Sequence, residues 1–272
     1  MAMFRSLLSP LKRPIRRALD SKLQEQIVSR TGLTPMGQYE TNDVFVAGYP
    51  KSGNTWFQNL LAGIVYGLDS DALPDTLIQD LVPDIHNRRY YRRYATPMYF
   101  KTHELPHAEH KRVIYLLRDG RDVMVSYFHY LKALNPNGAD FAEIVRTGRE
   151  LSPCKWHEHV AAWESNPFQA EMITVRYEDL LDEPLGQLRH ACEFIGVTRS
   201  DSQLQTVIEK SSFTKMRRKE EQLGWEDRAW PKDKFFVRRG VVGSYKDEMP
   251  PEVLALFLAD AEVTLRTYNY SV

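Results

Sequence analysis

An apolar run that leads into a glycine-containing loop constrains the fold of this chain more than any other feature. Val44–Ala47 is short and contains β-branched residues, which is typical of a buried parallel strand. Gly48 and Gly53 then keep the glycine spacing of a phosphate-binding loop, and apolar residues recur at helical spacing from Trp56 to Leu68. Because loop amides and the positive helix end converge, a strand, a loop and a helix in this order predict an anion site.

The lysine of this loop stands in an unusual place. In the loop of nucleoside-triphosphate-binding proteins, lysine directly follows the second glycine. In this chain Asn54 occupies that position, Thr55 keeps the hydroxyl group, and Lys51 lies within the loop. The segment therefore keeps the frame of an anion site, while its sequence argues against triphosphate chemistry.

The length and the charge balance narrow the class of protein. A chain of 272 residues is long enough for one large domain with a substantial core. Lys plus Arg and Asp plus Glu number 36 each, so the formal charge is zero and nucleic-acid binding is not expected. Cys154 and Cys192 lie far apart, which indicates neither a disulfide scaffold nor a cysteine zinc site. A reducing compartment is favoured, and we expect a cytoplasmic protein.

Residues 1–40 are expected to form a basic N-terminal arm and lead-in, followed by one main domain over residues 41–272. Residues 1–19 carry five Lys and Arg residues and no acid. Such an arm suits weak peripheral contact with an anionic membrane or a targeting segment, although Pro10 and Pro14 interrupt a long amphipathic helix. A solvated arm is the simpler interpretation. No apolar run of roughly 18 residues occurs, so no membrane-spanning helix is expected.

Three further apolar runs each end in polar residues. They are Pro97–Phe100 before Lys101-Thr102-His103, Val113–Leu117 before Arg118–Arg121, and Met172–Val175 before Arg176–Asp179. Helical patterns follow the second run and, between Pro184 and Gly196, the third. This alternation predicts an α/β fold, a single domain with a central, mainly parallel sheet flanked by helices. Ligands of such sheets bind at the carboxyl ends of the strands, where these polar groups lie.

Two connecting segments are expected to be irregular. Asp84–Pro97 is rich in arginine and tyrosine, and Thr214–Asp233 carries several Lys and Arg residues. Charged connections of this length are typical of mobile loops over a binding site. A last helix is expected around Pro251–Leu265, with its apolar face packed on the domain.

The loop resembles that of a known family, the sulfotransferases that use 3′-phosphoadenosine 5′-phosphosulfate (PAPS), particularly their soluble cytosolic type. Tyr49–Trp56 is similar to the family's 5′-phosphosulfate loop over eight consecutive positions. The resemblance implies a PAPS-binding enzyme that releases 3′-phosphoadenosine 5′-phosphate (PAP). By this likeness the loop residues hold the 5′-phosphate and the last of them lies near the adenine. These residues are Lys51, Ser52, Gly53, Asn54, Thr55 and Trp56.

A second segment resembles part of the family's grip on the 3′-phosphate. Arg118 and Ser126 lie eight residues apart, and the resemblance implies that this pair binds the 3′-phosphate. A planar guanidinium group offers paired donors to a phosphate, and a serine on the first helical turns adds a hydroxyl group. A surface ion-pair network at a helix start is the alternative if the segment is considered alone.

A third segment, Phe235–Lys246, resembles the C-terminal cofactor-binding segment of the family. The resemblance implies that Arg238, Arg239 and the amide of Gly240 complete the grip on the 3′-phosphate. Arginine, serine and tyrosine replace the usual lysine, aspartate and tryptophan at positions 239, 244 and 245. The cationic part of the pattern is therefore kept, and the rest is weakened.

Four more residues match positions that surround the adenine in relatives. They are Tyr177, Ser211, Phe213 and Met216. Considered alone, such residues would more often belong to an ordinary core.

The reacting groups are expected to be His103, Lys51 and Lys101. Lys101-Thr102-His103 resembles the family's segment in which histidine takes the proton from the acceptor hydroxyl, and a neutral imidazole suits that task. Lys51 would stabilise the leaving oxygen between phosphate and sulfate, and Lys101 would contact the sulfuryl group. Because amides and arginines would handle the phosphates, no metal is required.

Three other interpretations stay open at this point. His103, His107 and His110 have the spacing of a zinc site on one helix face, although Pro106 interrupts a regular helix there. A small-molecule P-loop kinase would explain the loop and Thr55, but not the missing lysine. A non-catalytic nucleotide-binding protein of the same fold is the third.

The sequence does not specify the acceptor. We expect a hydroxyl group on a small molecule, a lipid or a glycan, in preference to an amine, and Trp225 or Trp230 are candidates to contact a flat or lipidic acceptor. The dimer signature of cytosolic relatives would begin at Lys246, but Pro250 and Pro251 stand where it has threonine and valine. That dimer is therefore not expected.

Overall fold

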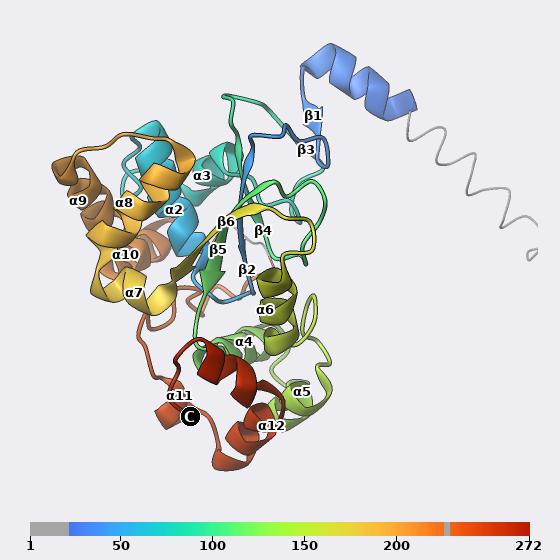
Figure 1. The fold of residues 1–272 in the computed structure, drawn as a ribbon, viewed down its shortest axis with the longest axis vertical. Helices are drawn as coiled ribbons and strands as arrows, with labels where there is room; N and C mark the ends of the chain where they lie inside the picture. The colour runs from blue at the N-terminus through green and yellow to red at the C-terminus, as the bar shows by residue number, and fades with distance from the viewer. Residues whose placement is uncertain (1–21, 226–228) are drawn as a thin grey trace, which may run out of the picture.

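A four-stranded parallel sheet forms the centre of the fold in a computed structural model that describes residues 22–225 and 229–272 (Figure 1). The strands are arranged in the order β4 (Tyr99–Thr102), β2 (Val44–Gly48), β5 (Arg112–Leu117) and β6 (Glu171–Arg176). Phe45 of β2 lies opposite Phe100 of β4 and Val113 of β5. Every residue of β2 is buried, as its apolar sequence predicts for a strand covered on both sides.

Helices cover both faces of this sheet. One apolar core contains Val46 and Ile114 together with residues of α2 (Asn54–Tyr66), α3 (Asp75–Leu81), α8 (Pro184–Ile195) and α9 (Asp201–Lys210). The other contains Phe45 and Val113 together with residues of α4 (Gly120–Leu134), α5 (Phe141–Thr147), α6 (Trp156–Ser165) and α12 (Pro251–Thr267). Because side chains alternate along a strand, neighbouring residues of β2 serve opposite cores. The expected α/β class is confirmed.

Shorter elements complete the described part of the chain. They are α7 (Tyr177–Asp182), α10 (Phe213–Leu223), α11 (Tyr245–Glu248) and an antiparallel pair of β1 (Thr34–Pro35) and β3 (Tyr90–Tyr91). Residues 22–31 are helical, and the basic arm expected from residues 1–19 lies outside the described residues. Over the described ranges, no helix is long and apolar enough to cross a membrane.

The expectation of an irregular segment over Thr214–Asp233 is wrong for its first half, which forms α10. Salt bridges explain how so charged a helix packs on the domain. The ammonium group of Lys219 is buried 2.6 Å from Asp75, and Asp71 pairs with Lys215 and Arg218. These acidic partners lie more than 130 residues earlier in the chain, so local periodicity could not indicate them.

Candidate active site

The loop between β2 and α2 has a backbone conformation that few residues adopt. Lys51 and Gly53 are both left-handed, with φ angles of 74° and 93°. This conformation costs a non-glycine residue about 1–2 kcal/mol, so strain is concentrated at Lys51. A Cβ atom at Gly53 would lie 2.7 Å from the ring of Tyr177. Glycine is therefore required at position 53 by the backbone and by the neighbouring ring.

Gly53→Ala is expected to destabilise the fold by roughly 1–3 kcal/mol and to weaken PAP binding, because the loop must shift away from Tyr177. Urea unfolding and titration calorimetry with PAP measure the two effects. Gly67→Ala is the matched control, since Gly67 has a similar φ of 68° but nothing within 4 Å of its added Cβ. Unchanged PAP affinity in Gly53→Ala would contradict the assignment of this loop to phosphate binding.

Buried polar atoms around the loop lack partners within the described part of the chain. They include the hydroxyl group of Ser52, Oδ1 of Asn54 and Nε of Arg118. A buried polar group without a hydrogen bond costs about 1–3 kcal/mol, and such groups mark sites where a ligand supplies the missing partner. The hydroxyl and the guanidinium nitrogen are donors, so an anion fits this position.

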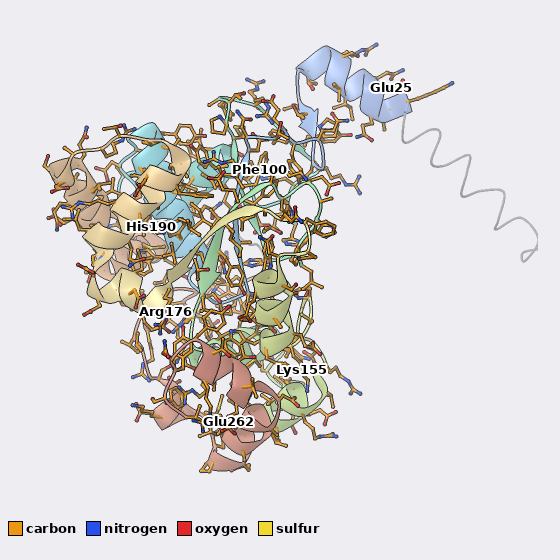
Figure 2. The ribbon with its side chains drawn as sticks, in the orientation of Figure 1. Glu25, Phe100, Lys155, Arg176, His190 and Glu262 are labelled. Carbon is orange, nitrogen blue, oxygen red and sulfur yellow. The ribbon has the colours of Figure 1, made fainter. Side chains whose placement is uncertain are left out.

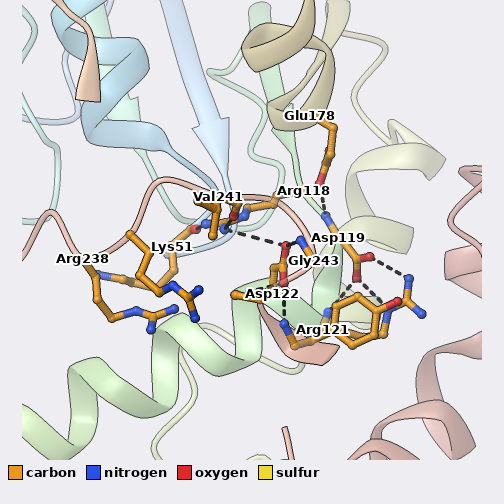
Figure 3. Close-up of polar contacts among 12 residues, drawn as sticks. Lys51, Arg118, Asp119, Arg121, Asp122, Glu178, Arg238, Val241 and Gly243 are labelled. Carbon is orange, nitrogen blue, oxygen red and sulfur yellow. Dashed lines mark hydrogen bonds and ion pairs between the residues drawn. The ribbon is translucent and has the colours of Figure 1, made fainter. Parts of the chain in front are cut away.

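Arg118 joins the loop to the C-terminal segment. Its guanidinium group donates to the carbonyl oxygens of Lys51 and Val241, both at 3.1 Å, and lies 4.2 Å from the centroid of the Tyr177 ring (Figure 3). Arg118 follows β5 directly, at the strand end where ligands of parallel sheets bind. Three contacts therefore fix the guanidinium group of Arg118, and its Nε remains available to a ligand.

Asp122 anchors the C-terminal segment. Its buried carboxylate accepts hydrogen bonds from the amides of Gly243 and Tyr245, at 2.7 and 2.9 Å, and from the hydroxyl of Ser244 at 3.1 Å. Figure 3 shows this carboxylate beside Arg118. Gly240 has a left-handed φ of 63°, and a Cβ atom there would lie 2.3 Å from the Phe213 ring. The segment thus reaches the site by a route that requires glycine at position 240.

Glu248 of α11 holds the two arginines of the C-terminal segment. Its carboxylate accepts from Arg238 at 2.6 Å and from Arg239 at 2.7 Å, and it lies 2.8 Å from Nε2 of His129. Burial raises the pKa of the Glu248 carboxyl, but hydrogen bonds from the two arginines outweigh this and leave the pKa below its usual value. Both guanidinium groups are therefore fixed on the wall of one cavity.

Lys51 extends over aromatic rings at this wall. Its ammonium nitrogen lies 3.8 Å from the ring centroid of Phe236 and 4.9 Å from that of Tyr130. Burial lowers the pKa of Lys51 to about 7, with further lowering by the charges of Arg118, Lys101 and Arg238. Near neutral pH the residue therefore loses part of its charge unless an anion compensates.

His103 lies just after β4, with its ring at the same cavity. Nδ1 lies 2.8 Å from the carbonyl oxygen of Gly48, which can only accept, so Nδ1 carries the hydrogen and Nε2 is an acceptor. Burial lowers the pKa of His103 to about 3, and the positive charge of Lys101 adds to the effect. The ring is therefore neutral at physiological pH, which is the form that can accept a proton.

Lys101 is paired with an acid that the sequence did not reveal as part of the site. Its ammonium group lies 2.8 Å from Oδ2 of Asp84, and both side chains are buried. Burial acts to raise the pKa of the Asp84 carboxyl, but Lys101 and the other neighbours bring it below the usual value. Asp84 lies in a segment expected to be an irregular loop, and the sequence carries no pattern that marks it.

These groups surround a cavity of about 520 Å³ at the carboxyl ends of the strands. Its size lies in the range of small-molecule sites. The expected site residues that line it are Lys51, Gly53, Asn54, Thr55, Trp56, Lys101, His103, Arg118, Ser126, Tyr177, Phe213, Met216, Arg238, Arg239 and Gly240. The structure therefore brings together residues that lie up to 189 positions apart in the chain, from 51 to 240.

Two expected site residues do not line the cavity. Ser211 is fully buried and its hydroxyl lies 2.8 Å from that of Ser70, while its carbonyl oxygen accepts from the indole of Trp56 at 2.9 Å. Ser52, within the loop, is buried, and its hydroxyl is unpartnered in the described ranges. Ser211 is thus linked to the site through the indole of Trp56.

The histidine zinc site considered from the sequence is not formed. The ring of His110 is buried against Phe45 and Trp163, and its Nδ1 accepts from the amide of His107. Among the described residues, no group of three His, Cys, Asp or Glu side chains is arranged to hold a metal ion. His110 is a packed core histidine.

Comparison with known proteins agrees with this geometry. A family model described as "Sulfotransferase domain" matches residues 41–266. Mouse sulfotransferase 1E1 is 25% identical over 231 residues, which cover 77% of this chain and 78% of the mouse protein. Flavonol 3-sulfotransferase of Flaveria bidentis is 26% identical over 250 residues, which cover 78% of each chain.

Solved structures share the fold. Retinol dehydratase in complex with androsterone and the inactive cofactor PAP superposes with a TM-score of 0.64 at 22% identity, over 86% of this chain and 84% of its own. Mouse sulfotransferase SULT7A1 complexed with PAP gives a TM-score of 0.61 at 21% identity, over 86% and 91%. The family model spans most of the chain, and the expected cofactor-binding residues line the cavity of this protein. This protein therefore belongs to the sulfotransferase family and is a PAPS-dependent sulfotransferase.

Proposed function

We propose that this enzyme transfers the sulfuryl group of PAPS to a hydroxyl group of a small-molecule, lipid or glycan acceptor, with His103 as the base and Lys51 as the cation at the leaving group. One observation carries the proposal: a single cavity is lined by a neutral histidine, a lysine displaced into the phosphate loop, and three arginines. We place this enzyme in the cytoplasm because one of its relatives, from Arabidopsis thaliana, is named cytosolic sulfotransferase 11.

The residues present fit the donor. Unpartnered donors of Ser52 and Arg118 suit a phosphate, and the guanidinium groups of Arg238 and Arg239 add fixed positive charge. Trp56 and Tyr177 meet edge to face at 5.6 Å and offer ring surface to an adenine. We therefore assign the 5′-phosphate to the loop with Ser52, Asn54 and Thr55, and the 3′-phosphate to Arg118, Ser126 and the 238–240 segment.

The chain's own groups divide the chemistry between them. PAPS, when bound, supplies an activated sulfuryl group whose transfer forms a bond to the acceptor oxygen and breaks the bond to the 5′-phosphate oxygen. Nε2 of His103 takes the hydroxyl proton of the acceptor. The ammonium group of Lys51 stabilises negative charge on the leaving phosphate oxygen. No metal is needed for these roles.

Lys101, which is paired with Asp84, has two proposed roles in the cavity. Burial lowers the pKa of His103 and the positive charge of Lys101 adds to this effect, which keeps the base neutral. We propose that the remaining donors of Lys101 face the sulfuryl group. Since the acid holds it in place, Lys101 acts as a fixed charge in the cavity.

An acceptor screen tests the proposed reaction. The enzyme is incubated with PAPS and a panel of phenols, steroids, lipid alcohols and glycans, with amines as a separate group, and products are analysed by mass spectrometry. We expect a sulfate-sized gain on at least one hydroxyl compound together with release of PAP. Modification of amines alone would contradict the proposed acceptor class.

PAP binding at pH 8 is expected to take up about one proton, because a bound anion raises the pKa of Lys51 from about 7 toward its ordinary value. The sign follows from the free state, in which Lys51 is mostly neutral at this pH. Titration calorimetry in two buffers of different ionisation enthalpy measures the uptake. Lys51→Met is expected to remove it, and wild-type binding without proton uptake would contradict the lowered pKa.

A further inference from the structure

A short segment runs along the free edge of β4 beside the proposed base. The amide of Lys101 donates to the carbonyl of Pro83 at 2.9 Å, and the amide of Ile85 donates to the carbonyl of Lys101 at 3.0 Å. Asp84 and Lys101 form the parallel bridge between these bonds. In a parallel ladder, the next amide of β4 that faces this segment is that of His103, and its regular acceptor is the carbonyl of Ile85.

A histidine side chain replaces that acceptor. The segment turns away at Asn87, whose amide donates to the carbonyl of Asp84 at 3.1 Å, so the ladder ends one step early. The amide of His103 donates instead to Nε2 of His86 at 3.0 Å. Since Nε2 accepts, the ring of His86 carries its hydrogen on Nδ1. His86 therefore caps the strand at the residue that bears the base.

Two further contacts tie His86 to the reacting groups. Its ring stacks on the ring of His103, with centroids 5.8 Å apart and planes 12° apart, and both rings line the cavity. Its amide donates to Oδ1 of Asp84 at 3.0 Å, while Oδ2 of the same carboxylate binds Lys101. His86 thus contacts His103 and Asp84, and the same Asp84 carboxylate binds Lys101.

We infer that His86 is a positioning residue for sulfate transfer: its Nε2 holds the His103 backbone so that the His103 ring bonds Gly48 and keeps its own Nε2 toward the acceptor. The inference rests on the proposed role of His103 as the base. A base held by its backbone on one side and by its ring on the other has little freedom to leave the productive geometry. His86 itself exchanges no proton with the acceptor.

Two substitutions of similar polarity separate this role from a general loss of structure. In His86→Gln, the side-chain oxygen can occupy the place of Nε2 and accept from His103; in His86→Asn, the side chain is too short and reaches only the place of Nδ1. We expect kcat of His86→Gln to stay within about threefold of wild type and kcat of His86→Asn to fall about 10²-fold. The KM for PAPS and the Kd of PAP should be unchanged in both.

Hydrogen exchange gives a readout that needs no turnover. The backbone amide of His103 should exchange about tenfold faster in His86→Asn than in wild type or His86→Gln, because only the first loses the hydrogen bond. Equal kcat and equal His103 exchange in the two variants would overturn the inference. His103→Ala with wild-type kcat would overturn the base assignment instead, and the exchange comparison would still report on His86. Since His86 is exposed, both variants are expected to fold.

Discussion

His103→Ala is expected to lower kcat by roughly 10²–10⁴-fold while PAP binds with unchanged affinity. The His103 ring lines the cavity, and its Nδ1 bonds to the carbonyl oxygen of Gly48, which is not among the groups assigned to the phosphates. Loss of the base therefore affects the chemical step and not donor binding. Initial rates with the acceptor found by screening give kcat, and calorimetry gives the Kd of PAP.

An exposed histidine serves as the control for this variant. His190 lies on α8 (Figure 2), outside the cavity, and His190→Ala should keep wild-type kcat. Because the pKa of His103 is lowered to about 3, its protonation should not reduce the rate until the pH approaches that value. A His103→Ala enzyme with near wild-type kcat would exclude this residue as the base.

Lys51→Met is expected to lower kcat by about 10²–10³-fold, the usual cost of losing one group that stabilises developing negative charge. Methionine keeps the length and the apolar stem over the rings of Phe236 and Tyr130, so the variant removes the charge with little change in packing. The comparison is made with kcat at saturating PAPS.

A reverse assay provides a further check on Lys51. In this assay the enzyme transfers the sulfuryl group from the sulfate ester of an acidic phenol to PAP. Lys51→Met should slow this reaction by a similar factor, because the 5′-phosphate oxygen of PAP passes through the same charged transition state in both directions. Lys111→Met, at an exposed position, is the control and should match wild type. A Lys51→Met enzyme that loses only PAP affinity would reassign Lys51 to ground-state binding.

The phosphate loop was predictable because all of its determinants are local. A buried strand from Val44, the glycines at 48 and 53 and the helix from Asn54 follow one another within a short stretch. Arg118 was predictable for a related reason, since it follows an apolar strand directly and polar residues at strand ends converge in parallel sheets. The resemblance of these segments to the motifs of one family indicated that they share a site.

The parts that were not predictable depend on contacts between distant segments. The ion pair between the buried Lys219 and the partly buried Asp75 stabilises α10, although the sequence of this helix is highly charged. Asp84 and His86 are positioned by one parallel bridge between Asp84 and Lys101 of β4. A pairing of only two residues leaves no periodic pattern in the sequence. Ser211 matched an adenine position but turns to Ser70, because side-chain direction depends on its neighbours in space.

The most direct test of the proposed function identifies the donor of the transferred group. The enzyme is given PAPS labelled in its sulfate and, in a parallel reaction, ATP labelled in its γ-phosphate with magnesium, each with the same acceptor panel. We predict label transfer from PAPS, with none from ATP, and a loss of transfer in His103→Ala. Transfer from ATP without transfer from PAPS would contradict the account and favour a kinase built on the same loop.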